Sequence, residues 1–186
     1  MKVIGLVASP RKNGNTDILL RKALEGARAE GAETEIYYLN ELSIRGCQGC
    51  YGCKKTGKCV IKDDLVKVFA AIDEANSVIL GSPVYFGRFT AQLALLMDRL
   101  YAYIKPDFTS HLGSGKKFGL VFTQGQADDG LYTELIRSTA KVLERIGFVA
   151  GPGALVGAGL REAGAVRKQE LFLQEAFAIG RVLAVQ

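Results

Sequence analysis

The sequence predicts an α/β fold in which a parallel β-sheet is covered by helices on both faces. Short apolar segments alternate along the chain with longer segments of helical spacing, and this alternation is typical of parallel sheets. With 186 residues, 48% of them hydrophobic, the chain can bury one sizeable core. No linker, repeat or low-complexity tract interrupts the pattern, so we expect a single domain over residues 1–186.

The first elements are a buried strand and an amphipathic helix. Residues 2–8 form a continuous apolar run, as expected for a strand covered on both faces. Residues 16–30 carry apolar side chains at helical spacing. Residues 35–39 are the second predicted strand, and Asp63 with Asp64 is predicted to begin a helix, because carboxylates complement the positive end of a helix dipole.

The remaining elements continue the alternation. We expect strands at residues 77–81, 117–123 and 148–156, and helices at residues 90–103, 132–146 and 161–185. In such sheets ligands bind at the carboxyl ends of the strands, beside the point where the strand order reverses. The loops after the first, third and fourth strands are therefore the candidate binding site.

The loop after the first strand, residues 9–16, has the composition of a phosphate-binding turn. Its hydroxyls, amides, backbone N–H groups and the guanidinium of Arg11 could surround a phosphate at the start of a helix. An ordinary capped turn uses the same Asn and Thr residues. The loop contains neither G-x-G-x-x-G nor G-x-x-x-x-G-K-[ST]. The main sequence evidence for a dinucleotide-binding Rossmann domain or a P-loop NTPase is therefore missing.

The loops after the third and fourth strands could complete a site for a flat ring. Residues 81–87 include Tyr85 and Phe86 where a polar turn would be expected, and backbone groups there could bond the edge of an isoalloxazine. The alternative is a buried turn whose aromatic rings fill space beneath a helix. The loop of residues 123–126 could close the far side.

All the cysteines of the chain lie in one short segment with the spacing C-x2-C-x2-C-x5-C: Cys47, Cys50, Cys53 and Cys59. Iron-sulfur clusters are usually held by four thiolates, and close spacing lets one loop wrap around the cluster. Structural zinc generally uses two C-x2-4-C pairs with a longer insert between them. Free or transiently oxidised thiols are the third interpretation, and the spacing favours a [4Fe-4S] cluster over both.

The charge and the apolar runs of the sequence indicate which kinds of binding partner to expect. The net charge of +5 is spread along the chain without a basic stripe, so an anionic cofactor is favoured over nucleic acid. No apolar run approaches the roughly 18 residues that would span a bilayer, so we expect no membrane. The first apolar stretch is too short for a signal-peptide core, which favours a cytoplasmic location over a secreted disulfide framework.

Three charged positions outside these loops are interpreted as surface features. His111 precedes a Gly-Ser-Gly turn and is expected to be a solvated loop residue. Asp98 and Arg99 are expected at a subunit interface or in a surface ion pair.

Four segments together resemble the iron-sulfur flavoprotein branch of the NADPH-dependent FMN reductase family. They are residues 9–16, residues 81–86, the helix end at residues 97–99 and the cysteine motif, and they occur in the same order over roughly the first 125 residues. The resemblance implies a flavodoxin-like three-layer sandwich with a five-stranded parallel sheet of order 2-1-3-4-5. The cysteine loop, residues 45–60, would be inserted after the second strand.

The resemblance also implies the site residues. The FMN phosphate would be held by Ser9, Arg11, Asn13, Asn15 and Thr16. The flavin ring would be lined by Pro83, Val84, Tyr85 and Phe86, and its other side or the ribityl chain by Thr123, Gln124 and Gly125. In the iron-sulfur members the four cysteines bind [4Fe-4S].

The function implied is an FMN-dependent oxidoreductase that passes electrons between FMN and the cluster, and on to a carrier protein such as ferredoxin or a small acceptor. The chemistry belongs to the cofactors, so no side chain is expected to act as a nucleophile or general base. An exposed cluster loop favours a homo-oligomer, either a homodimer or a homotetramer. Two alternatives stay open: an NAD(P)H-dependent FMN or quinone reductase without a cluster, and a non-enzymatic redox or metal sensor.

Overall fold

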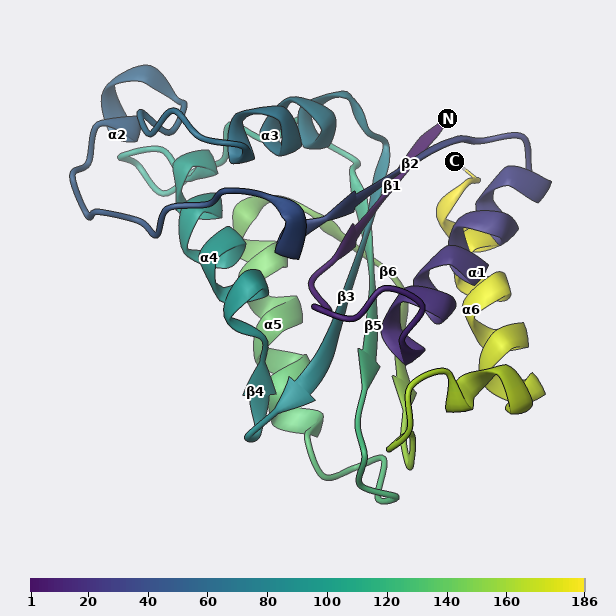
Figure 1. Ribbon diagram of the computed structural model, residues 1–186. Helices are drawn as coiled ribbons and strands as arrows, with labels where there is room; N and C mark the ends of the chain where they lie inside the picture. Colours follow the sequence, from purple (N-terminus) through teal and green to yellow (C-terminus); the bar gives the residue numbers. More distant parts are fainter. Residues whose placement is uncertain (186) are drawn as a thin grey trace.

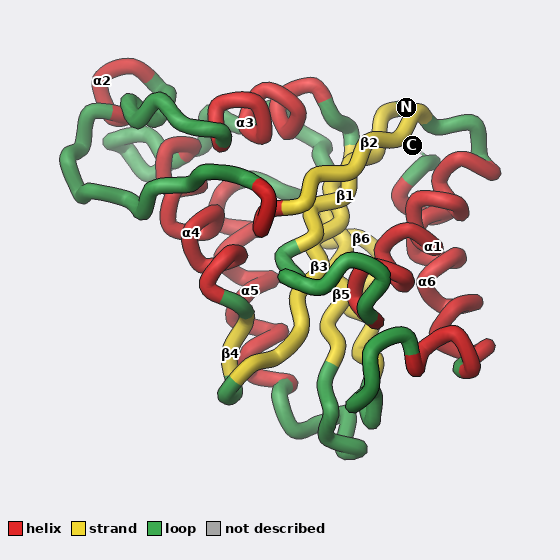
Figure 2. Tube along the Cα trace, in the orientation of Figure 1, coloured by secondary structure: helices red, strands yellow, loops and turns green. Residues whose placement is uncertain are grey.

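The computed structural model describes residues 1–185 and has the predicted three-layer architecture (Figure 1). Its parallel strands are β1 (Lys2–Val7), β2 (Glu33–Tyr38), β3 (Ser77–Tyr85), β5 (Lys117–Thr123) and β6 (Val149–Gly157). They lie side by side in the order β2-β1-β3-β5-β6, which Figure 2 shows as the yellow centre of the molecule. The predicted order of the parallel strands is confirmed, and a short strand β4 (Arg88–Phe89) adds an antiparallel partner to the end of β3.

Helices cover both faces of this sheet (Figure 1). One layer contains α1 (Asn15–Ala29) and α6 (Glu170–Leu183), and the other contains α3 (Leu65–Glu74), α4 (Ala91–Leu100) and α5 (Thr133–Ile146). Short helical turns are α2 (Cys53–Thr56), η1 (Leu39–Glu41), η2 (Tyr101–Tyr103) and η3 (Ala165–Lys168). Successive side chains of β1 enter different clusters, Ile4 and Leu6 under α3 and α4, Val3 and Val7 under α1 and α6. This alternation produces two cores, one on each side of the sheet.

Two glycines allow α1 and α6 to approach each other closely. A methyl group at Gly26 would overlap with the carbonyl of Phe177, and one at Gly180 would overlap with the carbonyl of Ala23. The backbones of the first and last helices are therefore in direct contact. Because α1 follows the first loop, this contact ties the position of that loop to the C-terminal part of the chain.

Two predicted boundaries are wrong. The third strand does not end at residue 81 but continues to Tyr85, because Val84 and Tyr85 pair with β4 in a hairpin whose turn is Phe86-Gly87. The last helix does not begin at residue 161 but at Glu170. Gly159 and Gly164 have φ of +72° and +78°, left-handed conformations that are incompatible with a helix, and residues 158–164 form a loop instead.

Within residues 1–185, none of the helices combines the length and the apolarity needed to cross a membrane.

Candidate functional site

A pocket of about 250 Å³ lies at the carboxyl ends of β1, β3 and β5. It is lined by residues from all three predicted loops: Ser9, Arg11, Asn15, Thr16, Pro83, Val84, Tyr85, Thr123, Gln124 and Gly125. Gly14, Leu160, Arg161 and Ala163 complete the lining. Of the predicted FMN-binding residues, the lining excludes only Asn13 and Phe86.

The N-terminus of α1 forms one wall of this pocket. The helix is capped by Gly14 without a side-chain bond, and its first backbone bond runs from Ile18 N to Gly14 O at 3.0 Å. The N–H groups of residues 15–17 are thus left without a partner in the helix, a situation that favours an anion. Arg11 is exposed at the same wall, and its backbone N–H donates to Ser9 Oγ at 3.2 Å.

Asn13 and Asp17 shape the loop from outside the pocket. Asn13 has φ of +59°, and its N–H donates to the carboxylate of Asp17 at 2.7 Å. Asp17 is fully buried and also accepts bonds from Arg21 Nε at 2.9 Å and the hydroxyl of Tyr38 at 3.0 Å. These donors balance the negative charge of the buried carboxylate, which lies in the first turn of α1.

The side chain of Asn15 connects the pocket to the last third of the chain. Its Nδ2 donates to the carbonyls of Leu160 at 3.2 Å and Glu162 at 2.8 Å, and its Oδ1 accepts from Val166 N at 3.1 Å. The side chain therefore anchors the loop of residues 158–164. The backbone N–H of Asn15 is the group that it offers to the pocket.

Gln124 brings an unpaired acceptor to the pocket. Its Nε2 donates to the carbonyls of Gln126 and Asp128, and its buried Oε1 has no hydrogen-bond partner among residues 1–185. Beside it, the buried hydroxyls of Thr16 and Thr123 lie 2.7 Å apart and bond each other. A buried acceptor without a partner is costly unless a ligand or water supplies the donor, and this acceptor fits a ligand with N–H or O–H groups.

The hairpin of β3 and β4 forms the open side. Pro83 and Val84 are half-buried, whereas Phe86 is fully exposed with φ of +49°. Phe86 therefore packs on nothing within the described chain.

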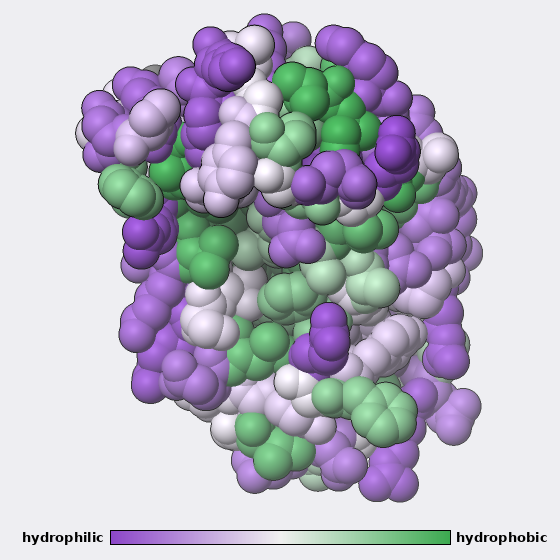
Figure 3. Space-filling view, turned by 90° about the vertical axis from the view of Figure 1, so that its left-hand side faces the viewer, coloured by the Kyte–Doolittle hydropathy of each residue, from purple (hydrophilic) through white to green (hydrophobic). Residues whose placement is uncertain are grey.

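Figure 3 shows the face that carries α4 and the cysteine loop, where hydrophobic residues gather along the middle between polar margins.

The four cysteines line a second pocket, of about 90 Å³, which also includes Asp98, Arg99 and Tyr101. They are Cys47, Cys50, Cys53 and Cys59, all free, the first two exposed and the last two partly buried. Within residues 1–185 no three His, Cys, Asp or Glu side chains are grouped to hold a single metal ion. The thiols nevertheless share one cavity, and their chemistry fits an iron-sulfur cluster.

Arg99 differs from its prediction as a surface residue. It is 1% exposed and forms an ion pair with Asp63 at 2.8 Å, while Nη1 also donates to Arg45 O at 2.8 Å. Burial lowers the pKa of Arg99, but the bond to Asp63 and the nearby Cys59 outweigh it, so the pKa lies above its ordinary value. The available signal was its place three residues after Leu96, on the buried face of α4.

The two pockets lie at opposite ends of α4. Thr90, which caps the helix, donates from its hydroxyl to Ala8 O at 2.9 Å, beside the first pocket, whereas Arg99 and Tyr101 line the cysteine pocket. A helix of this length spans roughly 15 Å. The cysteine loop is folded onto the far end of the helix, where Lys54 donates to Tyr101 O at 2.9 Å.

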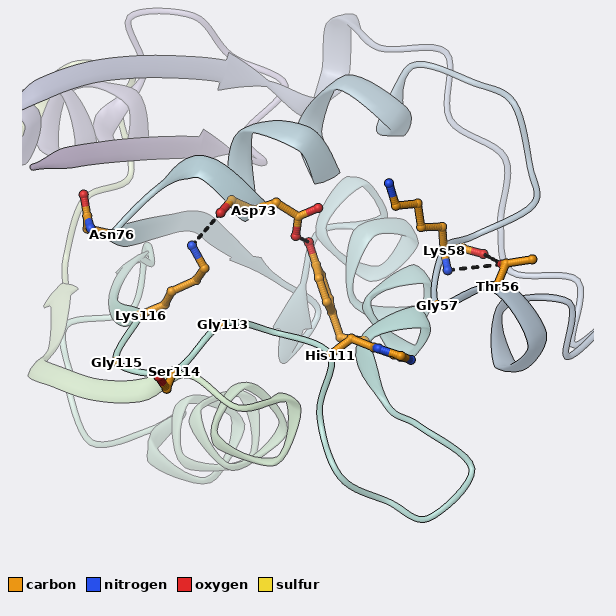
Figure 4. A pocket seen from close by; sticks show the side chains of 11 residues that line it. Thr56, Gly57, Lys58, Asp73, Asn76, His111, Gly113, Ser114, Gly115 and Lys116 are labelled. Carbon is orange, nitrogen blue, oxygen red and sulfur yellow. Dashed lines mark hydrogen bonds between the residues drawn. The ribbon is translucent and has the colours of Figure 1, made fainter.

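A third hollow, of about 510 Å³, lies at the opposite edge of the sheet (Figure 4). It is larger than the first pocket, but Asn76 and Lys116 line it from the amino ends of β3 and β5, where such folds do not bind ligands. The Lys116 ammonium already donates to Asp73 O at 2.7 Å. His111 lies exposed in this hollow, as predicted.

Comparisons with known proteins show which proteins the chain is similar to. A sequence model described as NADPH-dependent FMN reductase matches residues 1–180. An iron-sulfur flavoprotein of Methanocaldococcus jannaschii is 50% identical over 99 residues, which are 53% of this chain and 51% of that protein. An iron-sulfur flavoprotein of Methanosarcina thermophila is 30% identical over 138 residues, 74% of this chain and 70% of that protein. The match to the first relative thus spans about half of its length.

Solved structures with low sequence identity share the fold. A flavone reductase superposes with a TM-score of 0.77 at 18% identity, covering 99% of this chain and 62% of the other. The NAD(P)H:quinone oxidoreductase of Methanothermobacter marburgensis gives 0.72 at 19% identity, covering 100% and 98%. An archaeal flavodoxin gives 0.61 at 14% identity, covering 99% and 96%. The predicted flavodoxin-like fold is confirmed.

Proposed function

The chain belongs to the NADPH-dependent FMN reductase family, and on this premise we propose that it is an FMN-dependent oxidoreductase with a [4Fe-4S] cluster as its second redox centre. The observation that carries the proposal is the convergence of three separate loops, predicted from the sequence, on one pocket at the carboxyl edge of the sheet.

In this proposal the N-terminus of α1 and the guanidinium of Arg11 hold the FMN phosphate. Pro83, Val84 and Tyr85 line the ring. The unpaired Oε1 of Gln124 accepts a hydrogen bond from an N–H or hydroxyl of the ligand, which removes the cost of its burial. The role of Asn15 is to fix the wall formed by residues 158–164.

The four cysteines are the proposed cluster ligands, since all of them line one cavity. A bound flavin takes up electrons as a pair or singly and a cluster takes them one at a time, so together the two convert hydride transfer into single-electron transfer. The protein side chains bind and orient these groups. None of them is required as a nucleophile or general base.

The proposed electron donors and acceptors are NAD(P)H and a carrier protein such as ferredoxin. We place the protein in the cytoplasm, where thiols stay reduced. A homodimer or homotetramer would cover the exposed Cys47 and Cys50, and the hydrophobic residues on the face in Figure 3 are compatible with such a contact.

The test is an absorption spectrum of anaerobically purified protein with quantification of FMN, iron and sulfide. The proposal expects flavin bands above a broad visible shoulder that bleaches with dithionite. Stoichiometric FMN without iron or sulfide would instead support an NAD(P)H-dependent reductase that has no cluster. Absence of both chromophores would leave the sensor alternative.

A further inference from the structure

The guanidinium of Arg99 is held in the wall of the cysteine pocket with one donor unused. Its Nη1 and Nη2 bond Asp63 at 2.8 and 3.2 Å, and they also reach the carbonyls of Arg45 and Ile61. These partners fix the plane of the group. The remaining donor, Nε, is buried and has no hydrogen-bond partner among residues 1–185.

The cysteine pocket offers an acceptor for this donor. Arg99 lines the cavity together with the four cysteines, and the Cys59 side chain is near enough to contribute to the raised pKa of Arg99. A buried N–H without an acceptor costs about 1–3 kcal/mol. A thiolate or cluster sulfur at this wall would remove that cost.

We propose that Arg99 is a positioning residue for the cluster, donating from Nε to the sulfur of Cys59 or to an adjoining cluster sulfur and raising the cluster's reduction potential. The inference rests on the proposed cluster in the cysteine loop. Hydrogen bonds to sulfur and a nearby positive charge favour the more negative, reduced state of a cluster.

The other charges around the pocket do not reverse this direction. Asp63 faces Nη1 and Nη2, on the side of the guanidinium away from the free Nε. Asp98 lines the pocket but is exposed, so water and salt screen its charge. The Lys54 ammonium donates to the carbonyls of Tyr101 and Ile104.

The test compares wild type with Arg99→Lys in a potentiometric titration followed by electron paramagnetic resonance. Lysine keeps a cation beside Asp63 but has no Nε donor in a planar fork. At a fixed potential we expect the reduced-to-oxidised ratio of the cluster to fall at least tenfold, about 59 mV for one electron. The FMN potential in the same sample should stay unchanged.

Arg45→Lys is the matched control. Arg45 is exposed in the same loop and contributes only its backbone carbonyl to Arg99, so this variant should keep the wild-type cluster potential. The same cluster potential in wild type and Arg99→Lys would overturn the inference. Iron-free wild-type protein would overturn the proposed cluster, and the inference with it.

A measurement on folded protein covers the case in which Arg99→Lys does not fold. The Arg45→Lys protein is prepared with ¹⁵N in the arginine guanidinium groups, and the reduced cluster is recorded by pulsed electron paramagnetic resonance. A hyperfine coupling to ¹⁵N is expected, because the donor is bonded to a cluster sulfur. A cluster signal without nitrogen coupling from the guanidinium would overturn the inference.

Discussion

The Nδ2 of Asn15 donates to the carbonyl oxygen of Glu162 at 2.8 Å, across 147 residues of sequence. Replacing Asn15 with Ala leaves two carbonyls and the Val166 N–H without their partners. We expect a loss of stability of about 1–3 kcal/mol and weaker FMN binding, measured by urea unfolding and flavin titration. Asn40→Ala, at an exposed asparagine, should leave both values near wild type.

Arg11→Ala should weaken FMN retention by about 1.5–3 kcal/mol, because a charge-assisted contact to the phosphate is lost. The measurement is the dissociation constant of FMN from the apoprotein. Lys12→Ala removes a charge from the same loop at a residue that does not line the pocket, so it is the control. An unchanged constant for Arg11→Ala would contradict its assignment to the phosphate.

Cys53→Ser should remove or convert the cluster and leave FMN bound, since the cysteine pocket and the first pocket share no lining residue. Iron, sulfide and flavin contents report the two sites separately. Lys55→Ser changes the same helical turn outside the cavity and should keep its iron. Wild-type iron and sulfide in the Cys53 variant would exclude this thiol as a ligand.

Tyr103→Phe should lower stability by about 1 kcal/mol at pH 7, because the buried hydroxyl donates to Asp73 Oδ1 at 2.8 Å. Burial, with the bond to Asp73, raises the pKa of Tyr103 above its ordinary value. A raised pKa gives stability that is complete below the unfolded-state value, about 10, and is lost as the pH rises beyond it. The gap between wild type and variant should therefore narrow above about pH 10.

Unfolding by urea from pH 7 to pH 11 measures this gap. Tyr101→Phe is the control, because Tyr101 is an exposed neighbour and keeps its ring in the variant. A gap that stays constant through the alkaline range would refute the assignment.

Gly180→Ala should destabilise the protein by about 1–3 kcal/mol, although alanine is the better helix former. The new methyl group would meet the carbonyl of Ala23 and push α6 away from α1. Thermal unfolding reports the loss. Ala178→Gly, on the exposed side of α6, measures the effect of helix propensity alone. If the Gly180→Ala protein were more stable than wild type, the contact between α1 and α6 would not require glycine at residue 180.

The sequence predicted the layers because apolar segments alternate with helical segments, whereas the order of the parallel strands was implied by the resemblance to the FMN reductase family. It also predicted most of the pocket, since short loops at strand ends must meet at one edge of a parallel sheet. Arg161 and Leu160 were not predicted to line the pocket, because the last helix was expected to begin at residue 161, directly after Leu160. Their loop is held there through the backbone carbonyls of Leu160 and Glu162, which accept hydrogen bonds from Asn15, and a carbonyl has no residue type by which a pattern could reveal it.

Arg99 was mistaken for a surface residue for a related reason. Charge suggests exposure, and only the neutralising Asp63, 36 positions away, makes burial affordable. Such a pairing depends on tertiary contact and is not visible in local spacing.

The helix α4 also sets the distance between the first pocket and the cysteine pocket, which lie at its opposite ends. Each residue turns the helix by about 100°. Inserting or deleting one residue between Thr90 and Arg99 would therefore rotate the guanidinium of Arg99 away from the cysteine loop. Such a change would alter both the distance between the two pockets and the direction in which the Arg99 side chain points. Only a change by whole helical turns would alter the distance and keep the direction.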